Sequence, residues 1–275
     1  MKIKLAENYG FCFGVKRAIK IAEENRNAAT YGPLIHNIKE IERLKRDFNV
    51  SLAKNPDDFQ AGDKAVIRTH GITKDELQIL KEKNVDVINA TCPFVTKPQH
   101  ICAEMSKEGY DIVIFGDESH PEIRGVKSYA QNRAYVVENV EELEGLHLKD
   151  KVAIVAQTTR RIEEYLKITD YLIPRHKEVR VFNTICNATF DNQDAIRKLS
   201  KEADVIIVIG GKNSSNTKQL HSIAKSNCSD SYLIECADDM DPSWFDDKKL
   251  CGISAGASTP DWIIREVVER IEQIA

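Results

Sequence analysis

Short runs of β-branched and aliphatic residues recur along the chain, and each is followed by a polar or glycine-bearing turn and then by a stretch with helical spacing. This alternation is typical of parallel α/β units, in which a crossover helix follows each strand. The pattern predicts an α/β fold with strands over residues 2–6, 65–68, 86–89, 111–115, 151–155, 180–183, 204–209 and 250–253.

Two stretches outside these strands carry a clear helical stripe. Apolar residues recur at i, i+3, i+4 and i+7 from Val15 to Ala22, and every fourth residue from Ile263 to Ile271 is apolar. Pro260 suits the first turn of the second stretch, because its fixed φ and missing N–H cost little there. Both stretches are therefore predicted to be amphipathic helices.

Three cysteines, Cys12, Cys92 and Cys186, each lie just beyond a predicted strand, 80 and 94 residues apart along the chain. Each interval is long enough for about one small α/β unit. The spacing therefore predicts three such units in a pseudo-threefold arrangement. No linker rich in Pro, Gly or Ser separates them, so we expect the units to pack tightly.

Composition narrows the class of protein. With 275 residues, 42% hydrophobic and 30% charged, the chain matches an ordinary globular protein. A net charge of −4, without a basic cluster interleaved with aromatic residues, argues against nucleic-acid binding. No apolar run approaches the length of a membrane span, and the first ten residues do not resemble a signal peptide. We therefore expect a cytoplasmic protein with no membrane partner.

Cysteine usage agrees with a reducing compartment. The seven cysteines are odd in number and widely spaced, which argues against a disulfide framework. Cys102, Cys228, Cys236 and Cys251 lie in predicted helical or strand contexts without a polar signature and are predicted to be buried structural thiols. Thiolates from Cys12, Cys92 and Cys186 could bind zinc together with a histidine, could bind an iron-sulfur cube with one iron left open, or could bind no metal. Spacing alone does not choose among these.

Polar residues gather after the predicted strands, where the loops of parallel sheets bind ligands. The segment from Gly210 to Asn216, which includes Ser214 and Ser215, combines close backbone approach with side-chain donors and suggests an anion cradle. Ser258 repeats this design before the last helix. Simple helix capping is the alternative explanation for both loops. The glycine spacing and the terminal Lys-Thr or Lys-Ser of a Walker loop are absent.

Histidines and one glutamate add to these loops. His36, His70 and His120 all fall in predicted loops at strand ends, where imidazole can donate to phosphate oxygens. Glu122 follows His120 across a proline and is a candidate proton donor, since burial near other anions would raise its pKa. The alternatives are solvated or capping histidines and a surface glutamate.

These residues form a recognisable set. The chain resembles the 4-hydroxy-3-methylbut-2-enyl diphosphate reductase family over nearly its whole length and in the family's order. The motifs that carry the resemblance are Gly10-Phe11-Cys12-Phe13-Gly14-Val15, His36-Asn37, Thr69-His70-Gly71, Ala90-Thr91-Cys92-Pro93, His120-Pro121-Glu122, Gln157-Thr158-Thr159, Thr184-Ile185-Cys186, Asn213-Ser214-Ser215-Asn216 and Ala255-Gly256-Ala257-Ser258.

The resemblance implies a trefoil of three α/β domains around a central cluster cavity, with domains over residues 14–92, 93–182 and 183–275, the last completed by residues 1–13. It also implies one 4Fe-4S cluster held by Cys12, Cys92 and Cys186. The fourth iron has no protein ligand in the family and binds the substrate's hydroxyl oxygen. Two electrons and protons then cleave the C–O bond and give isopentenyl and dimethylallyl diphosphate, the last step of the non-mevalonate isoprenoid pathway.

The resemblance also assigns roles by motif. The diphosphate of the allylic substrate would be bound by His36, His70, Ser214, Asn216 and Ser258, with contributions from His120 and Ser215. Glu122 and Thr158, beside His120, would deliver the proton. A ferredoxin or flavodoxin would donate the electrons. The rival functions are a zinc-dependent phosphate-ester hydrolase and a cluster-binding redox sensor without turnover.

Overall fold

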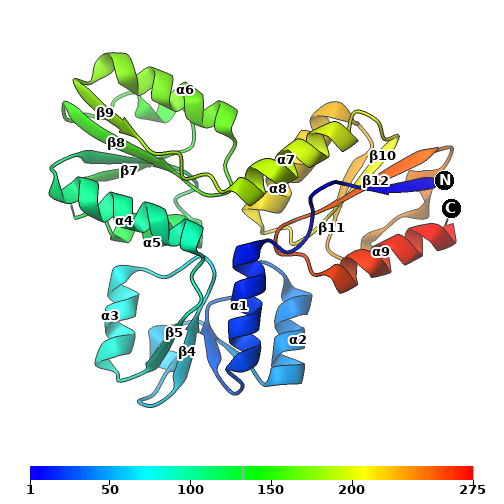
Figure 1. Ribbon diagram of the computed structural model, residues 1–275, viewed down its shortest axis with the longest axis horizontal. Helices are drawn as coiled ribbons and strands as arrows, with labels where there is room; N and C mark the ends of the chain where they lie inside the picture. The colour runs from blue at the N-terminus through cyan, green and yellow to red at the C-terminus, as the bar shows by residue number, and fades with distance from the viewer. Residues whose placement is uncertain (132, 275) are drawn as a thin grey trace. The chain divides into compact units, whose positions relative to one another are not determined.

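The computed structural model describes residues 1–131 and 133–274, and they form an α/β protein (Figure 1). Three parallel sheets of four strands each account for the described strands, which confirms the predicted fold class. The chain divides into two compact units. The first comprises Met1–Lys16, His36–Glu42 and the residues from Asn187 onward, and the second comprises Arg17–Ile35 and Arg43–Cys186.

The first unit holds one sheet that joins the beginning of the chain to its end. The order is β1 (Lys2–Leu5), β12 (Leu250–Ala255), β10 (Val205–Ile209) and β11 (Ser231–Ile234). β1 pairs with β12 in parallel, so an N-terminal strand completes a sheet built from C-terminal residues (Figure 1). Helices α7 (Asn187–Leu199) and α8 (Ser215–Asn227) pack on one face, and α9 (Asp261–Ile274) packs on the other.

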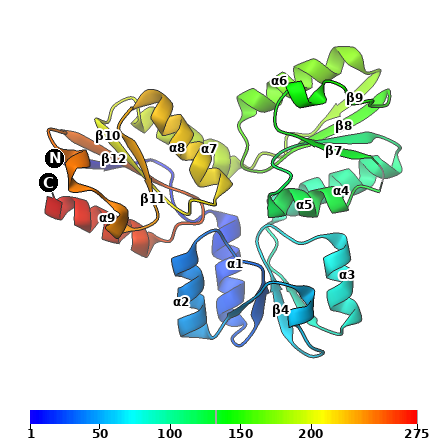
Figure 2. The same ribbon diagram turned by 180° about the vertical axis from the view of Figure 1, so that it is seen from behind.

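The second unit holds the other two sheets. The first of them has the order β3 (Ser51–Ala53), β2 (Ala29–Tyr31), β4 (Lys64–Ile67) and β5 (Asp86–Asn89). The second has the order β7 (Ala134–Val137), β6 (Asp111–Phe115), β8 (Lys151–Ala156) and β9 (Glu178–Val181). Helices α4 (Pro93–Lys107) and α5 (Pro121–Ser128) cover one face of this last sheet, and α6 (Ile162–Leu172) covers the other (Figure 2).

The remaining helices are α1 (Phe13–Glu24), α2 (Ile38–Phe48) and α3 (Lys74–Glu82), together with short 3₁₀ turns at Pro56–Asp58, Glu141–Leu143, Ile173–Arg175, Ala237–Asp239 and Pro242–Phe245. The predicted stripes are buried: Ala18 and Ala22 of α1 and Ile263, Val267 and Ile271 of α9 are inaccessible to solvent. Both helical predictions are confirmed. Within the described residues, no helix is long and apolar enough to cross a membrane.

All three sheets share one strand order. In both sheets of the second unit, the first strand along the chain lies between the second and the third, and the fourth pairs with the third. The first unit's sheet repeats this order with β10, β11 and β12 as its first three strands and β1 in place of the fourth. This common order supports three related α/β units. The domain boundaries themselves stay a prediction, as does their arrangement around one cavity.

Four strands were absent from the sequence prediction: β2, β3, β7 and β11. β3, β7 and β11 are edge strands, and β2 is only three residues long, so none of them forms the long apolar run that marks a central strand. The fully buried strands β6 and β10 coincide with the predicted ranges to within one residue.

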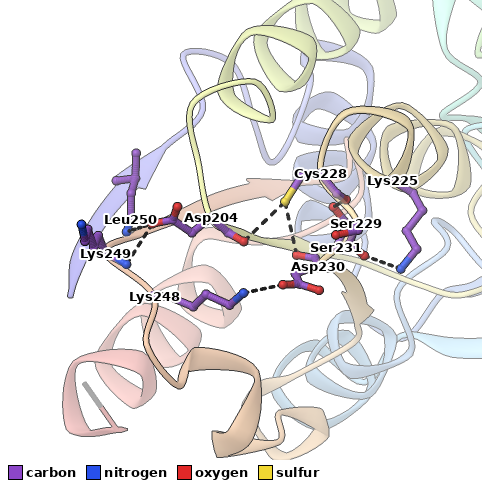
Figure 3. Close-up of polar contacts among 9 residues, drawn as sticks. All are labelled: Asp204, Lys225, Cys228, Ser229, Asp230, Ser231, Lys248, Lys249 and Leu250. Atoms are coloured by element: carbon purple, nitrogen blue, oxygen red, sulfur yellow. Dashed lines mark hydrogen bonds and ion pairs between the residues drawn. The ribbon is translucent and has the colours of Figure 1, made fainter.

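The end of the first unit's sheet that lies at the start of β10 shows why some cysteines are structural (Figure 3). The Asp204 carboxylate accepts hydrogen bonds from the backbone N–H groups of Lys249 and Leu250, both at 2.9 Å. The buried Cys228 thiol donates to the backbone carbonyls of Asp204 and Asp230 at 3.6 and 3.7 Å. These contacts join α8 to two strands, as predicted for a structural thiol.

The other cysteines outside the predicted cluster set behave in two ways. Burial raises the pKa of Cys102 to about 12 and that of Cys251 to about 12. Both thiols therefore stay protonated at neutral pH and make poor metal ligands. Cys236 is partly exposed rather than buried, which corrects the expectation for that residue. It directly precedes the short 3₁₀ turn Ala237–Asp239.

Candidate functional site

Glu122 is a buried carboxyl at the N-terminus of α5, with 2% of its surface exposed. Its two oxygens accept hydrogen bonds from Thr158, one from the backbone N–H at 2.7 Å and one from the side-chain hydroxyl at 2.8 Å. Thr158 lies just after β8, so parallel pairing of β6 with β8 brings it beside the loop that precedes α5. The structure thus brings together the two residues predicted to deliver the proton.

The protonation state of Glu122 follows from this environment. Burial raises its pKa to about 7, although the two Thr158 hydrogen bonds and the charge of Arg160 favour the carboxylate. Desolvation is the largest of these effects. A carboxyl with this pKa can both hold and release a proton near neutral pH, as a general acid requires.

His120 caps the same helix and has a defined tautomer. Its Nδ1 accepts a hydrogen bond from the backbone N–H of Glu122 at 3.2 Å. In the neutral ring the proton therefore lies on Nε2, which can donate to an anion. The His70 ring meets the His120 ring edge to face, with centroids 5.4 Å apart. The second unit thus places two of the predicted diphosphate donors beside each other.

Two of the three key thiols are tied to these residues through the backbone. The Cys92 N–H donates to the carbonyl of Thr69 at 2.9 Å, and Thr69 directly precedes His70. The Cys186 N–H donates to the carbonyl of Thr158 at 3.0 Å. Within the second unit, Thr158 and the residue that precedes His70 therefore each accept a backbone hydrogen bond from a key cysteine.

The first unit brings together other predicted donors. The Ser258 hydroxyl donates to the backbone carbonyl of His36 at 3.4 Å. A Cβ added to Gly211 would lie 2.3 Å from the same carbonyl oxygen, so only glycine lets the loop after β10 approach His36 this closely. β10 and β12 are neighbours, with Ile209 paired to Ala255, and the loops that follow them are therefore adjacent.

Asn216 in α8 is the clearest sign of an anion site in this unit. Its side chain is 4% exposed, and neither the amide nitrogen nor the amide oxygen has a hydrogen-bond partner among the described residues. Buried polar atoms of this kind are costly unless a ligand or water satisfies them. Ser214 caps α8 by accepting from the Thr217 N–H at 3.3 Å, and Ser215 is the first helical residue. A helix cap and an unsatisfied buried amide therefore occur in the same loop.

Cys12 belongs to the same unit as these donors. Its N–H donates to the carbonyl of Ala257 at 3.3 Å, one residue before Ser258. The Cys12 carbonyl accepts from the Lys16 N–H at 2.9 Å and so begins α1. The third key thiol therefore lies next to the serine loop predicted to bind phosphate.

A shared position distinguishes the three key cysteines from the other four. Cys12, Cys92 and Cys186 each directly precede an α-helix, and all three are partly exposed, whereas the partly exposed Cys236 precedes only a 3₁₀ turn. Accessible cysteine sulfurs are the ligands that soft metal ions and iron-sulfur clusters take. The donor set therefore fits the cofactor that the sequence resemblance implies.

Arg160 and Arg68 were given no role from the sequence. Arg160 is buried, pairs with Glu138 at 2.7 Å, and its charge acts on Glu122. Arg68 is half-buried, and its Nε donates to the Gly71 carbonyl at 3.1 Å, which fixes the turn that carries His70. Both directly adjoin predicted motifs, but their contacts depend on tertiary packing.

Comparison with known proteins gives a consistent result. A model of the LytB protein family matches residues 3–272. The 4-hydroxy-3-methylbut-2-enyl diphosphate reductase of Sulfurimonas denitrificans is 69% identical over 272 residues, which cover 99% of each chain. The reductase of the same name from Campylobacter concisus is 62% identical over 274 residues, which cover 100% of each chain.

Two solved structures are also similar. A structure of (E)-4-hydroxy-3-methyl-but-2-enyl diphosphate reductase, the terminal enzyme of the non-mevalonate pathway, is 42% identical, with a TM-score of 0.73 over 99% of this chain and 100% of that one. E-1-hydroxy-2-methyl-but-2-enyl-4-diphosphate reductase from Plasmodium falciparum is 27% identical, with a TM-score of 0.92 over 97% of this chain and 86% of that one.

The reductases to which this chain is similar and its three parallel sheets with crossover helices make it an α/β oxidoreductase. The match extends along almost the whole chain, and identity is far above the level needed to establish a family. The chain belongs to the LytB protein family.

Proposed function

We propose that this chain reduces 4-hydroxy-3-methylbut-2-enyl diphosphate to isopentenyl and dimethylallyl diphosphate, the terminal reaction of the non-mevalonate pathway. The observation that carries the proposal is the buried Glu122–Thr158 pair, because cleavage of a C–OH bond needs a proton donor that works near neutral pH. Relatives named as this reductase support it at 69% and 62% identity.

Cys12, Cys92 and Cys186 are proposed to hold one 4Fe-4S cluster. The fit rests on their partial exposure and on their position at the start of α-helices. A bound cluster would pass electrons to the substrate and would supply a Lewis-acidic iron. The need for thiolates places the reaction in a reducing compartment, for which we propose the cytoplasm.

Glu122 is proposed to protonate the leaving hydroxyl group. Hydroxide is a poor leaving group, and a proton from the carboxyl converts it to water as the C–O bond breaks. Two electrons and a second proton, which goes to carbon, complete the reduction. Thr158 orients the carboxyl through its N–H and its hydroxyl, and both hydrogen bonds also stabilise the carboxylate that remains after proton transfer.

The diphosphate is proposed to lie against His36, His70, Ser214, Asn216 and Ser258, with His120 and Ser215 contributing. The unsatisfied amide of Asn216 and the Nε2 proton of His120 are the donors that the geometry supports best. Anchoring at the phosphates holds the reacting carbon in place.

A reduced-dye assay with anaerobically purified protein tests the function. The proposal predicts consumption of the allylic diphosphate, formation of both five-carbon products and dependence on reductant. Activity in air without reductant, together with one zinc per chain, would instead support a phosphate-ester hydrolase. A bound cluster with no consumption would support a redox sensor.

Asn216→Ala should weaken substrate binding without destabilising the protein much. The amide atoms have no partner among the described residues when substrate is absent, so their removal loses no protein hydrogen bond there. We expect KM to rise about tenfold, the equivalent of one hydrogen bond to a charged group. Ser214→Ala is the contrasting variant, because loss of the cap should also lower the free energy of unfolding by about 1 kcal/mol. Thermal melts and steady-state kinetics would separate the two effects, and an Asn216→Ala enzyme with normal KM would contradict the assignment.

Turnover should fall as pH rises through the pKa of Glu122. The pKa of about 7 predicts that kcat/KM declines above pH 7, by about tenfold for each further unit once the carboxyl is ionised. The decline in kcat should come at higher pH, because the negative charge of a bound diphosphate favours the protonated carboxyl. Rates measured from pH 6 to 9 with a dye reductant would check this, and a rate that rises over this range would contradict it.

A further inference from the structure

A groove in the second unit runs along the first half of α4, the helix that begins immediately after Cys92. It has a volume of about 490 Å³. Its walls include Thr91 and Pro93, the two residues on either side of Cys92. Both sequence neighbours of Cys92, a proposed cluster ligand, therefore line the groove.

The groove is basic although the chain as a whole carries a net charge of −4. Arg17, Lys97 and His100 line it, against one carboxylate, that of Glu104. Lys97 and His100 are exposed. The N-terminus of α4, which carries the positive end of the helix dipole, begins at Pro93 in the wall of the groove. A local excess of positive charge on an acidic protein favours an acidic partner.

Arg17 fixes the base of this groove. Its two terminal nitrogens donate to the carbonyls of Asn89 and Thr91, both at 3.2 Å. These contacts join α1 to the loop before Cys92 and hold the guanidinium charge in place. A preformed charged surface binds with less loss of side-chain freedom than a flexible one.

We propose that this groove is the docking surface for an acidic electron-carrier protein, of the ferredoxin or flavodoxin type. The inference rests on the proposed function, because a reductase whose own residues supply protons but no electrons needs an external donor. A carrier seated on Arg17, Lys97 and His100 would place its redox centre next to the loop that carries Cys92. Phe94, which follows the groove residue Pro93 in the chain, is also exposed, with 39% of its surface accessible, and could add apolar area to such an interface.

Charge reversal at Lys97 tests the surface without touching the proposed catalytic residues. The holoenzyme and its Lys97→Glu variant would be titrated with a purified acidic ferredoxin, and separately with an acidic flavodoxin, at roughly 50 and 300 mM salt. We expect Lys97→Glu to raise the Kd about tenfold or more at low salt, with a smaller effect at high salt. Glu104→Lys should lower the Kd, a gain that misfolding cannot produce. Lys167→Glu, at an exposed lysine of α6 outside the groove, is the matched control.

Turnover driven by each carrier should fall with binding in Lys97→Glu, while turnover driven by reduced viologen stays unchanged. Loss with either carrier supports the proposal and shows which redox centre the surface accepts. An unchanged Kd with both carriers, or an equal loss in Lys167→Glu, would overturn it. Absence of viologen-driven turnover in the unmodified enzyme would count against the reductase function instead, so the two failures are distinguishable.

Discussion

Replacing Glu122 with glutamine is expected to lower kcat by about 100-fold or more, while cluster content and KM stay close to those of the unmodified enzyme. The glutamine amide has nearly the same shape as the carboxyl. Its oxygen can still accept from the Thr158 N–H, which lies 2.7 Å from one oxygen of Glu122 in the unmodified protein. The amide cannot deliver a proton. Loss of turnover with retained binding would therefore isolate the proton-transfer role from a structural one.

Glu118→Gln provides the control, because Glu118 lies in the same loop but is exposed and pairs with Lys127 on the surface. Its removal should leave kcat unchanged. Dye-driven kinetics of both variants, with iron content measured on the same samples, would test the assignment. Near-normal kcat in Glu122→Gln would show that another group or a water molecule supplies the proton.

The same substitution should change how stability depends on pH. The pKa of Glu122 rises from 4.5 to about 7 on folding, so the stability linked to its protonation is fully present below pH 4.5 and is lost as pH rises through 7. Each unit of this shift corresponds to about 1.4 kcal/mol. Glutamine carries no such charge, so Glu122→Gln should be stabilised relative to the unmodified protein at pH 8.5 but much less so at pH 5. Denaturant unfolding at the two pH values would show the difference.

Cys186→Ser is expected to abolish or severely weaken cluster assembly, and with it all turnover. A serine hydroxyl stays protonated at neutral pH and is a poor replacement for a thiolate on iron. The position of Cys186 before α7 and its backbone contact with Thr158 should persist, so the protein should remain folded. Iron, acid-labile sulfide and the visible absorption of the anaerobically purified variant would report the loss.

Cys236→Ser is the matched control, because Cys236 is also partly exposed but begins only a short surface turn. It should retain the full cluster. If Cys186→Ser kept its cluster while Cys236→Ser lost it, the third ligand would have to be reassigned to Cys236.

The central strands could be predicted from the sequence because burial on both faces requires continuous apolar runs, as in β6 and β10, where every residue is buried. Edge strands such as β7 and β11 lack that requirement and left a weaker signal. The pairing of β1 with β12 could not be predicted from the local pattern, because it joins residues separated by almost the whole chain. Only the family resemblance implied that residues 1–13 complete the last domain.

The site residues were predictable by type and position, since each follows a strand in a loop with unusual polar composition. Their physical state was not. The raised pKa of Glu122 depends on burial by surrounding elements, and the tautomer of His120 depends on one backbone contact. The same limit applies to Asn216: the sequence suggested both a cap and a cradle, and only packing shows that Ser214 caps the helix while the Asn216 amide is left unsatisfied.

The proposed chemistry depends on a 4Fe-4S cluster held by Cys12, Cys92 and Cys186. The presence of this cluster can be measured without any assay of turnover. Protein purified without oxygen should be brown and contain about four iron and four acid-labile sulfide ions per chain. A colourless protein with seven titratable thiols, or one zinc per chain in place of iron, would contradict it.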